Sequence, residues 1–168
     1  MSIDDSRKEA VDHAWKIHEA VLGWTEKVDS KANYVATIET ALIVGAVAMQ
    51  TSGRRFGHLH GMALVLYWVG LGLLILGLVM CVWVVRPRLR TAKVKTESTN
   101  NFIYFGHVKH WDPTALENAF YKQDMLAMLS RQLVATSKIA WEKHLMLRWS
   151  VHLTAAGVLT LVWCSMAR

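Results

Sequence analysis

The sequence contains few of the residues that bend or cross-link a chain. Two prolines, Pro87 and Pro113, and two cysteines, Cys81 and Cys164, are spread over 168 residues. Because proline is the residue that most strongly breaks a helix, long uninterrupted helices are permitted outside the segment between the two prolines. Two distant cysteines indicate neither a disulfide framework nor a cysteine-based metal site.

Motifs of catalysis are also missing. The chain has no glycine-rich phosphate loop, no His-Glu-x-x-His motif and no nucleophile elbow. His107 and His110 are three residues apart, but no third metal ligand is obvious near them. We therefore expect a protein that is not an enzyme and that carries no metal and no resident cofactor.

Charge is missing from long segments. Residues 61–85 carry no charged side chain, and at 1.5 Å per residue such a helix is about 37 Å long, more than the ~30 Å hydrocarbon core of a bilayer. Residues 149–167 also carry no formal charge, and residues 32–52 carry only Glu39. The sequence therefore predicts three membrane spans, at 32–52, 61–85 and 149–167.

The loop charges predict an orientation. The loop between the first two spans holds Arg54 and Arg55, whereas five basic residues follow the second span: Arg86, Arg88, Arg90, Lys93 and Lys95. Basic loops face the cytoplasm, so we expect a cytoplasmic N-terminus, a cytoplasmic region at 86–147 and an external C-terminus in the inner (plasma) membrane. The opening "MSIDDSRKEAVDH" is too polar for a cleaved signal peptide. The basic run adjoins a span and lacks interleaved aromatics, so we expect no nucleic-acid partner.

The remaining segments predict a single all-α membrane domain with long cytoplasmic helical extensions. Residues 5–31 are amphipathic and no proline separates them from the first span, which predicts one helix from about 5 to 51. The segment 86–113 reads as a basic stretch followed by an ordered loop. Asp112-Pro113, with a capping box at Thr114–Glu117, predicts the start of a helix that runs through 114–147 into the third span.

Three stretches carry a family resemblance. They are "WTEKVDSKANYVATIETALIVGA", with Asp29-Ser30-Lys31-Ala32; "NNFIYFGHVKHWDPTAL", with Tyr104-Phe105-Gly106-His107 before Asp112-Pro113; and "LVATSKIAWEKHLMLRWSV", with Lys143 and Arg148. In this order they resemble the transmembrane effector domain of Pycsar anti-phage systems. The resemblance implies an effector that impairs the membrane on infection, activated by cCMP or cUMP from a partner cyclase.

The location of a nucleotide site is open. Tyr104, Phe105 and His107 are candidates because aromatic rings can stack on a base, and Arg88 and Lys93 are basic candidates for the phosphate. The alternative is a loop that packs on the long helices. A chain with three spans makes a poor channel alone, so we expect a homo-oligomer. The alternative function is a membrane scaffold or regulatory subunit that recruits a cytoplasmic partner.

Glu39 is the unusual residue of the first span. A charge near the bilayer centre costs about 2.5–3.5 kcal/mol, and each large aliphatic neighbour returns only about 0.3–0.6 kcal/mol. The span is therefore marginal without a partner helix or a hydrated cavity. Three interpretations remain open: a structural carboxyl that is protonated or bonded to Thr37, Thr40 or another span, a carboxyl lining a path or gate between subunits, and one reaching the inner interface.

Small residues mark two faces for close helix packing, within one chain or between subunits. The first span offers Ala41, Gly45 and Ala48, and the third span offers His152, Ala156, Thr160 and Cys164.

Overall fold

The computed structural model describes residues 3–52, 56, 59–87 and 94–166, and all regular structure in these ranges is helical. The chain divides into two compact units. Unit 1 comprises Met1–Thr25 and Pro87–Trp141, and unit 2 comprises Glu26–Arg86 and Glu142–Arg168. Each unit has its own buried cluster of side chains, so each is described separately.

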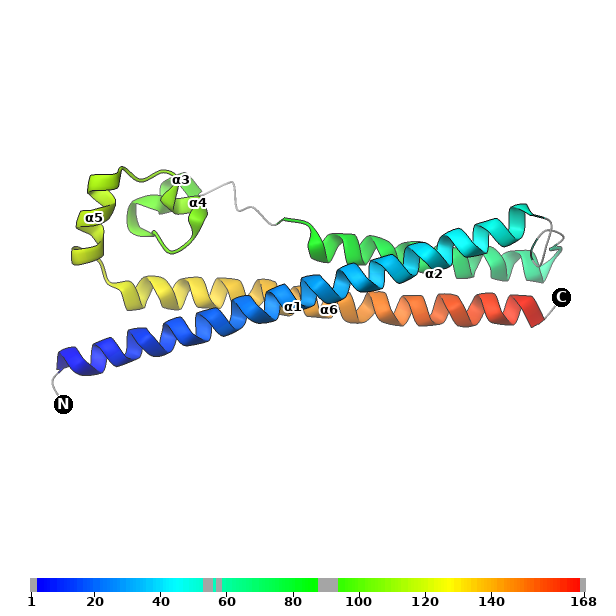
Figure 1. The fold of residues 1–168 in the computed structure, drawn as a ribbon, viewed down its shortest axis with the longest axis horizontal. Coiled ribbons are helices and arrows are strands. Elements are labelled where there is room, and N and C mark those ends of the chain that lie inside the picture. The colour runs from blue at the N-terminus through cyan, green and yellow to red at the C-terminus, as the bar shows by residue number, and fades with distance from the viewer. Residues whose placement is uncertain (1–2, 53–55, 57–58, 88–93, 167–168) are drawn as a thin grey trace. The chain divides into compact units, whose positions relative to one another are not determined.

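Three helices dominate the chain: α1 (Ile3–Thr51), α2 (Met62–Val85) and α6 (Met125–Met166) (Figure 1). Each contains a segment long and apolar enough to cross a membrane. The three predicted spans overlap these helices, with Ser52 and Gly61 just outside them and Ala167 outside the described residues. The helix predicted from about 5 to 51 is confirmed by α1. The continuity of α1 follows from the absence of proline and from the apolar face that runs along it.

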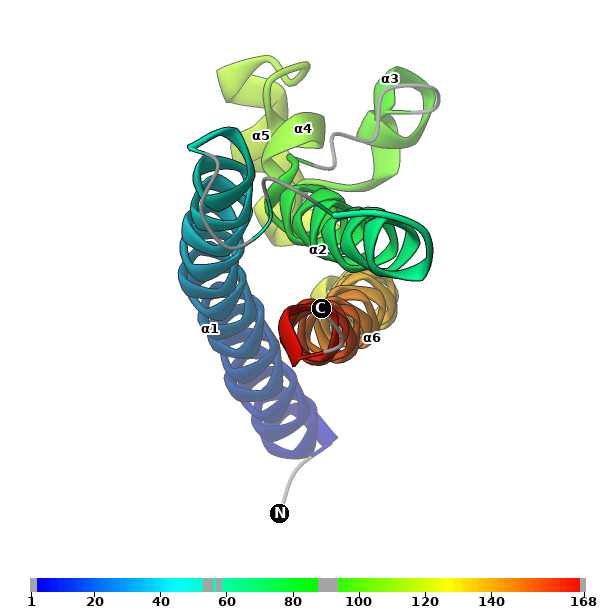
Figure 2. The same cartoon turned by 90° about the vertical axis from the view of Figure 1, so that its right-hand side faces the viewer.

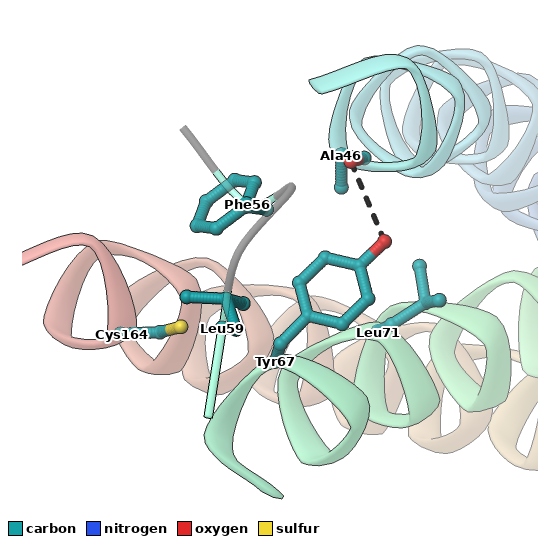
Figure 3. Packing of buried hydrophobic residues seen from close by; sticks show 6 residues of the cluster. All are labelled: Ala46, Phe56, Leu59, Tyr67, Leu71 and Cys164. Atoms are coloured by element: carbon teal, nitrogen blue, oxygen red, sulfur yellow. Dashed lines mark hydrogen bonds between the residues drawn. The ribbon is translucent and has the colours of Figure 1, made fainter. Parts of the chain in front are cut away.

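In unit 2, the three helices lie side by side and enclose two apolar clusters (Figures 1 and 2). One cluster gathers around Tyr67, whose hydroxyl donates to the carbonyl of Ala46 at 3.4 Å (Figure 3). In the same region the Cys164 thiol donates to the Ala63 carbonyl at 3.1 Å. The second cluster comprises Val28, Ala32, Cys81, Val84 and Leu147.

The close approach of helices in unit 2 depends on glycines of α2 and α6. A Cβ atom placed on Gly70 would lie 2.8 Å from the Leu161 side chain, and one on Gly157 would lie 3.0 Å from the Gly70 carbonyl oxygen. In contrast, a Cβ on Gly45 would meet nothing within 4 Å. Gly70 and Gly157 therefore let the backbones of α2 and α6 approach closely, and neither belongs to the two faces of small residues expected from the sequence.

Those two faces are mostly turned outward in the single chain. Ala41 and Ala48 of α1 are exposed, as are His152 and Ala156 of α6. Cys164 is the buried member of the α6 face. Packing within one chain therefore does not use most of these residues, and packing between subunits stays a prediction.

Unit 1 contains four short helical elements between its long ones: α3 (Val94–Glu97), the 3-10 turn η1 (Ser98–Asn100), α4 (Phe105–Val108) and α5 (Pro113–Lys122). The predicted loop at 86–113 is thus ordered into short helices over its described part. Its Phe102 packs with Ala119 of α5 and Met128 of α6, and the Trp111 indole donates to the Asn101 carbonyl at 3.1 Å. The segment is therefore held by an aromatic core of its own.

The prediction of one helix from 114 into the third span is wrong, because α5 ends at Lys122 and α6 begins at Met125. The carboxylate of Asp124 accepts from the backbone N–H of Leu126 at 3.1 Å and of Ala127 at 3.3 Å, which satisfies the first turn of α6. It also forms an ion pair of 3.0 Å with Arg7.

The predicted capping box is wrong as well. Asp112 is the N-cap of α5, and its carboxylate accepts from Thr114 N at 3.0 Å and from Ala115 N at 3.2 Å. Thr114 therefore lies inside the helix, and Pro113 occupies the first turn, where a missing N–H costs nothing.

Candidate functional site

The candidate site surrounds Glu39, which is completely buried between the three helices of unit 2. Its Oε1 atom accepts from the Ser150 hydroxyl at 2.9 Å and also from the Thr154 hydroxyl. These two residues are four apart on α6, so their side chains lie on one face of that helix. The Cys81 thiol of α2 lies 3.1 Å from the Ser150 oxygen. Each of the three helices thus supplies a polar group to one small network.

Gly77 of α2 makes room for the carboxyl group. A Cβ atom at this position would lie 2.5 Å from Glu39 Oε1 and 3.1 Å from Thr154 Oγ1. A side chain of any size would therefore displace the carboxyl group or separate α2 from its neighbours. Glycine at this position is a requirement of the site rather than of the helix, which glycine weakens.

The two threonines next to Glu39 on its own helix are not its partners. Thr37 donates to the Asn33 carbonyl at 2.9 Å, and Thr40 donates to the Ala36 carbonyl at 2.8 Å. Each hydroxyl is thus used within its own turn, as is common for threonine inside helices. Of the hydrogen-bond partners considered from the sequence, only the neighbouring span is used.

The position of Glu39 along the helix is deep within the predicted span. Seven residues separate it from Ala32 and twelve from Thr51, which correspond to about 10 Å and 18 Å of helix. Its carboxyl is enclosed by helices of its own chain, and a role in a path between subunits stays a prediction.

A second polar contact joins α1 and α6 within unit 2. The Lys143 ammonium lies 2.7 Å from both carboxylate oxygens of Asp29, and Lys143 is only 7% exposed. Both residues occur in the quoted sequence stretches, yet their pairing was not predicted. A clue was available, because each precedes the start of its predicted span by a few residues.

The segment Tyr104–His107 contains both packed and exposed side chains. The Tyr104 ring lies 5.4 Å from that of His107, and a Cβ on Gly106 would lie 2.9 Å from Tyr104 Cδ1. His107 is buried, with its Nε2 atom 3.6 Å from a carboxylate oxygen of Glu97. Phe105, in contrast, is 67% exposed. Tyr104 and His107 therefore support the local fold, whereas Phe105 is presented to the surroundings.

Two other predicted residues, Arg88 and Lys93, lie outside the described residues. Within the described ranges no group of three His, Cys, Asp or Glu side chains is arranged to hold a metal ion. Cys81 and Cys164 are both buried free thiols.

Comparison with known proteins gives one match. The family model described as the Pycsar effector protein domain, PycTM, matches residues 13–167 of the 168. No curated protein and no solved structure gave a match. The match covers α2, α6 and the part of α1 from residue 13 onward, together with the Glu39 and Asp29–Lys143 contacts. It confirms the resemblance inferred from the sequence. The chain therefore belongs to the Pycsar effector family as a transmembrane domain of anti-phage defence.

Proposed function

We propose that this chain is a membrane effector that a cyclic pyrimidine nucleotide, cCMP or cUMP, switches on during phage infection, and that it then impairs the integrity of the inner membrane. The observation that carries the proposal is the family match over residues 13–167, which extends across all three helices able to cross a membrane. The nucleotide comes from a partner cyclase, and several copies of the chain act together.

The polar network around Glu39 is where this proposal locates the membrane step. A carboxyl group at this depth is costly, and intramembrane ionisable residues commonly mark ion paths or relays. Hydrogen bonds from Ser150 and Thr154 stabilise Glu39 in a closed bundle. A rearrangement of α1 against α6 would break these bonds and expose the carboxyl to water or to other subunits.

Phe105 is the residue through which we propose that the nucleotide contacts unit 1. Its ring is exposed, and base stacking on an aromatic ring needs an accessible face. Tyr104 and His107 hold the short helix that presents it. Ligand binding must favour the active state over the resting state by about 5.5 kcal/mol to convert a 1:99 population into 99:1.

The experiment uses cells that express the chain together with a cyclase of the same kind of system, with membrane potential read by a dye. Depolarisation should follow cCMP or cUMP production and should not follow cAMP or cGMP. A catalytically inactive cyclase is the control. A membrane potential that holds under every cyclic nucleotide would refute the proposal.

The same cells test Glu39. Glu39→Gln keeps the shape and the acceptor oxygen, so a purely structural role predicts unchanged depolarisation in a folded protein. A role in the membrane step predicts altered depolarisation at unchanged protein size in detergent. Wild-type behaviour of the variant would return Glu39 to the structural interpretation.

A further inference from the structure

The contacts between α1 and α6 determine which residues of these two helices lie at the same level in unit 2. Lys143 donates to Asp29, 114 residues away in the sequence, and Ser150 donates to Glu39, 111 residues away. A residue of α1 is therefore level with the residue of α6 that follows it by about 111 to 114 positions.

The level of α2 against α6 is also fixed by contacts. The Cys81 thiol lies 3.1 Å from the Ser150 oxygen, and towards the other end of unit 2 the Cys164 thiol donates to the Ala63 carbonyl. The two contacts show that α2 runs in the opposite direction to α6 (Figure 1). Trp83, two residues beyond Cys81, is therefore level with the α6 residue two before Ser150.

Each of the three helices places one large aromatic side chain on the outside of unit 2 at a common level. Tyr34 of α1 is 73% exposed, Trp83 of α2 is 49% exposed and Trp149 of α6 is 52% exposed. The two registers place these residues within about one helical turn of one another along unit 2. Tyrosine and tryptophan rings at such a common level mark the headgroup region of a bilayer. We call these three residues the aromatic girdle.

A cation accompanies each ring of the aromatic girdle. Lys31 lies three residues before Tyr34 on α1, and Arg86 lies three residues after Trp83 on α2. Because the two helices run in opposite directions, both cations lie about one turn from the girdle on the same side of it. On α6 the cation is Arg148, which directly precedes the ring of that helix. We call Lys31, Arg86 and Arg148 the basic collar.

The charges of the basic collar are available to a ligand. All three side chains are exposed, and none forms an ion pair in the part of the chain that the structure describes. The Arg86 guanidinium lies 5.2 Å from the centre of the Trp83 ring, which orients the cation without neutralising it. The segments 26–34, 83–86 and 142–149 carry five Lys or Arg and three Asp or Glu, so their net charge is +2. This end of unit 2 therefore attracts anions.

The surroundings of the basic collar select the kind of anion. Beyond the aromatic girdle, each helix continues into a segment long and apolar enough to cross a membrane. The anionic group that lies directly beside hydrocarbon is the phosphate of a phospholipid, and guanidinium and ammonium groups both donate hydrogen bonds to phosphate. A zwitterionic headgroup also carries a cation, which a positive surface repels, whereas a headgroup of net negative charge is attracted.

We propose that the basic collar binds anionic phospholipids, with the lipid phosphates on Lys31, Arg86 and Arg148 and the acyl chains along the apolar helices beyond the aromatic girdle. Because the collar takes one cation from each helix, bound lipids contact α1, α2 and α6 in the arrangement that the structure describes. A ligand that binds only this arrangement stabilises it. The inference goes beyond the proposed function and does not depend on a nucleotide.

The first test is a lipid titration of the purified full chain in neutral detergent, with retained lipid read by native mass spectrometry. Phosphatidylglycerol should bind more tightly than phosphatidylcholine of the same acyl chains, and equal binding of the two lipids would overturn the proposal. Each of Lys31→Gln, Arg86→Gln and Arg148→Gln should weaken phosphatidylglycerol binding about fivefold, which is the contribution of one basic residue near an anionic surface. Unchanged binding in the triple variant would also overturn it.

The matched control removes three exposed cations that lie in unit 1: Lys16→Gln, Arg131→Gln and Lys138→Gln. This control has the same net charge as the triple collar variant and should bind phosphatidylglycerol as the wild type does. An equal loss of binding in both would show that only the total charge matters and would refute the collar. Excess glycerol phosphate should leave the lipid bound, and displacement by it would replace the lipid with a soluble phosphate as the ligand.

The second test measures stability in a bilayer. Thermal unfolding is compared between phosphatidylcholine nanodiscs and nanodiscs that also contain phosphatidylglycerol. The anionic lipid should raise the Tm of the wild type and leave that of the triple collar variant unchanged. The charge-conserving variant with Lys31→Arg, Arg86→Lys and Arg148→Lys should recover the rise, which separates loss of charge from loss of fold. An equal rise in the wild type and the triple collar variant, or no rise in the charge-conserving variant, would contradict the proposal.

Discussion

The two partners of the Asp29–Lys143 ion pair should differ in how much their substitution lowers the free energy of unfolding of unit 2. The pair has two contacts of 2.7 Å, and the side chain of Lys143 is 9% exposed while that of Asp29 is 32% exposed. Removal of one partner of a fully buried pair costs about 3–5 kcal/mol, whereas an exposed pair contributes about 0–1 kcal/mol. Since Asp29 is partly hydrated, we expect Asp29→Asn to lower the free energy of unfolding by about 2–3 kcal/mol.

Substitution of the other partner, Lys143, should lower the free energy of unfolding by less. Lys143→Met keeps the aliphatic stem and leaves Asp29 unpaired where water still reaches it, so we expect a loss of about 1 kcal/mol. The double variant no longer contains the buried ammonium, so its loss of stability should be close to that of Lys143→Met alone. The coupling energy between the two positions then equals the cost of Asp29→Asn alone, about 2–3 kcal/mol.

The assay is unfolding of the purified chain in mixed micelles, followed by loss of helical circular dichroism. Lys31→Met is the matched control, since Lys31 is an exposed cation on the same helix and should change stability by less than about 0.5 kcal/mol. If Asp29→Asn were no more destabilising than Lys31→Met, or if the two effects simply added, the pair would not be a buried, coupled contact.

Three further positions and the topology give predictions of their own. Gly77→Ala should destabilise the bundle by about 1–3 kcal/mol because its methyl group collides with the carboxyl of Glu39, whereas Gly45→Ala, which meets nothing, should be near neutral in the same unfolding assay. Hydrogen bonds from the Ala127 backbone and then from Arg7 lower the pKa of Asp124 in the folded protein. The contribution of Asp124 to stability is therefore present above pH ~4 and is lost as the pH falls through this lowered pKa. Asp124→Asn should flatten that part of the stability–pH curve. Phe105→Ala should weaken cCMP or cUMP binding in calorimetry, whereas loss of Tyr121, an exposed aromatic ring of α5, should not. A reporter fused to the C-terminus should be active only outside the cytoplasm, and a cytoplasmic signal would contradict the predicted orientation.

The long helices were predictable because their determinants are local. Proline is absent from 3–51 and from 125–166, and the apolar segments are long enough to need no knowledge of their neighbours. The break before Met125 was missed because neither proline nor glycine marks it. It depends on Asp124, a residue that also occurs on ordinary helix surfaces and acts as a cap here through two backbone contacts.

The partners of Glu39 could not be derived in the same way. The free-energy cost of placing Glu39 in a span predicted that the carboxyl group has a partner. The identity of that partner depends on the register of α1 against α6, and 111 residues separate Glu39 from Ser150. Glycines give a similar lesson. Gly45, Gly70 and Gly77 are alike in sequence, and only the packed helices distinguish the open position from the crowded ones.

The two native cysteines give this bundle built-in probes. Both thiols are buried, Cys81 beside Ser150 and Cys164 against the Ala63 carbonyl, near the two ends of unit 2. A buried thiol reacts with an alkylating reagent only while its surroundings are open, so the alkylation rate measures the population of the open state. Because the chain has no other cysteine, the unmodified protein can report whether activation loosens one end of the bundle, the other end, or both together.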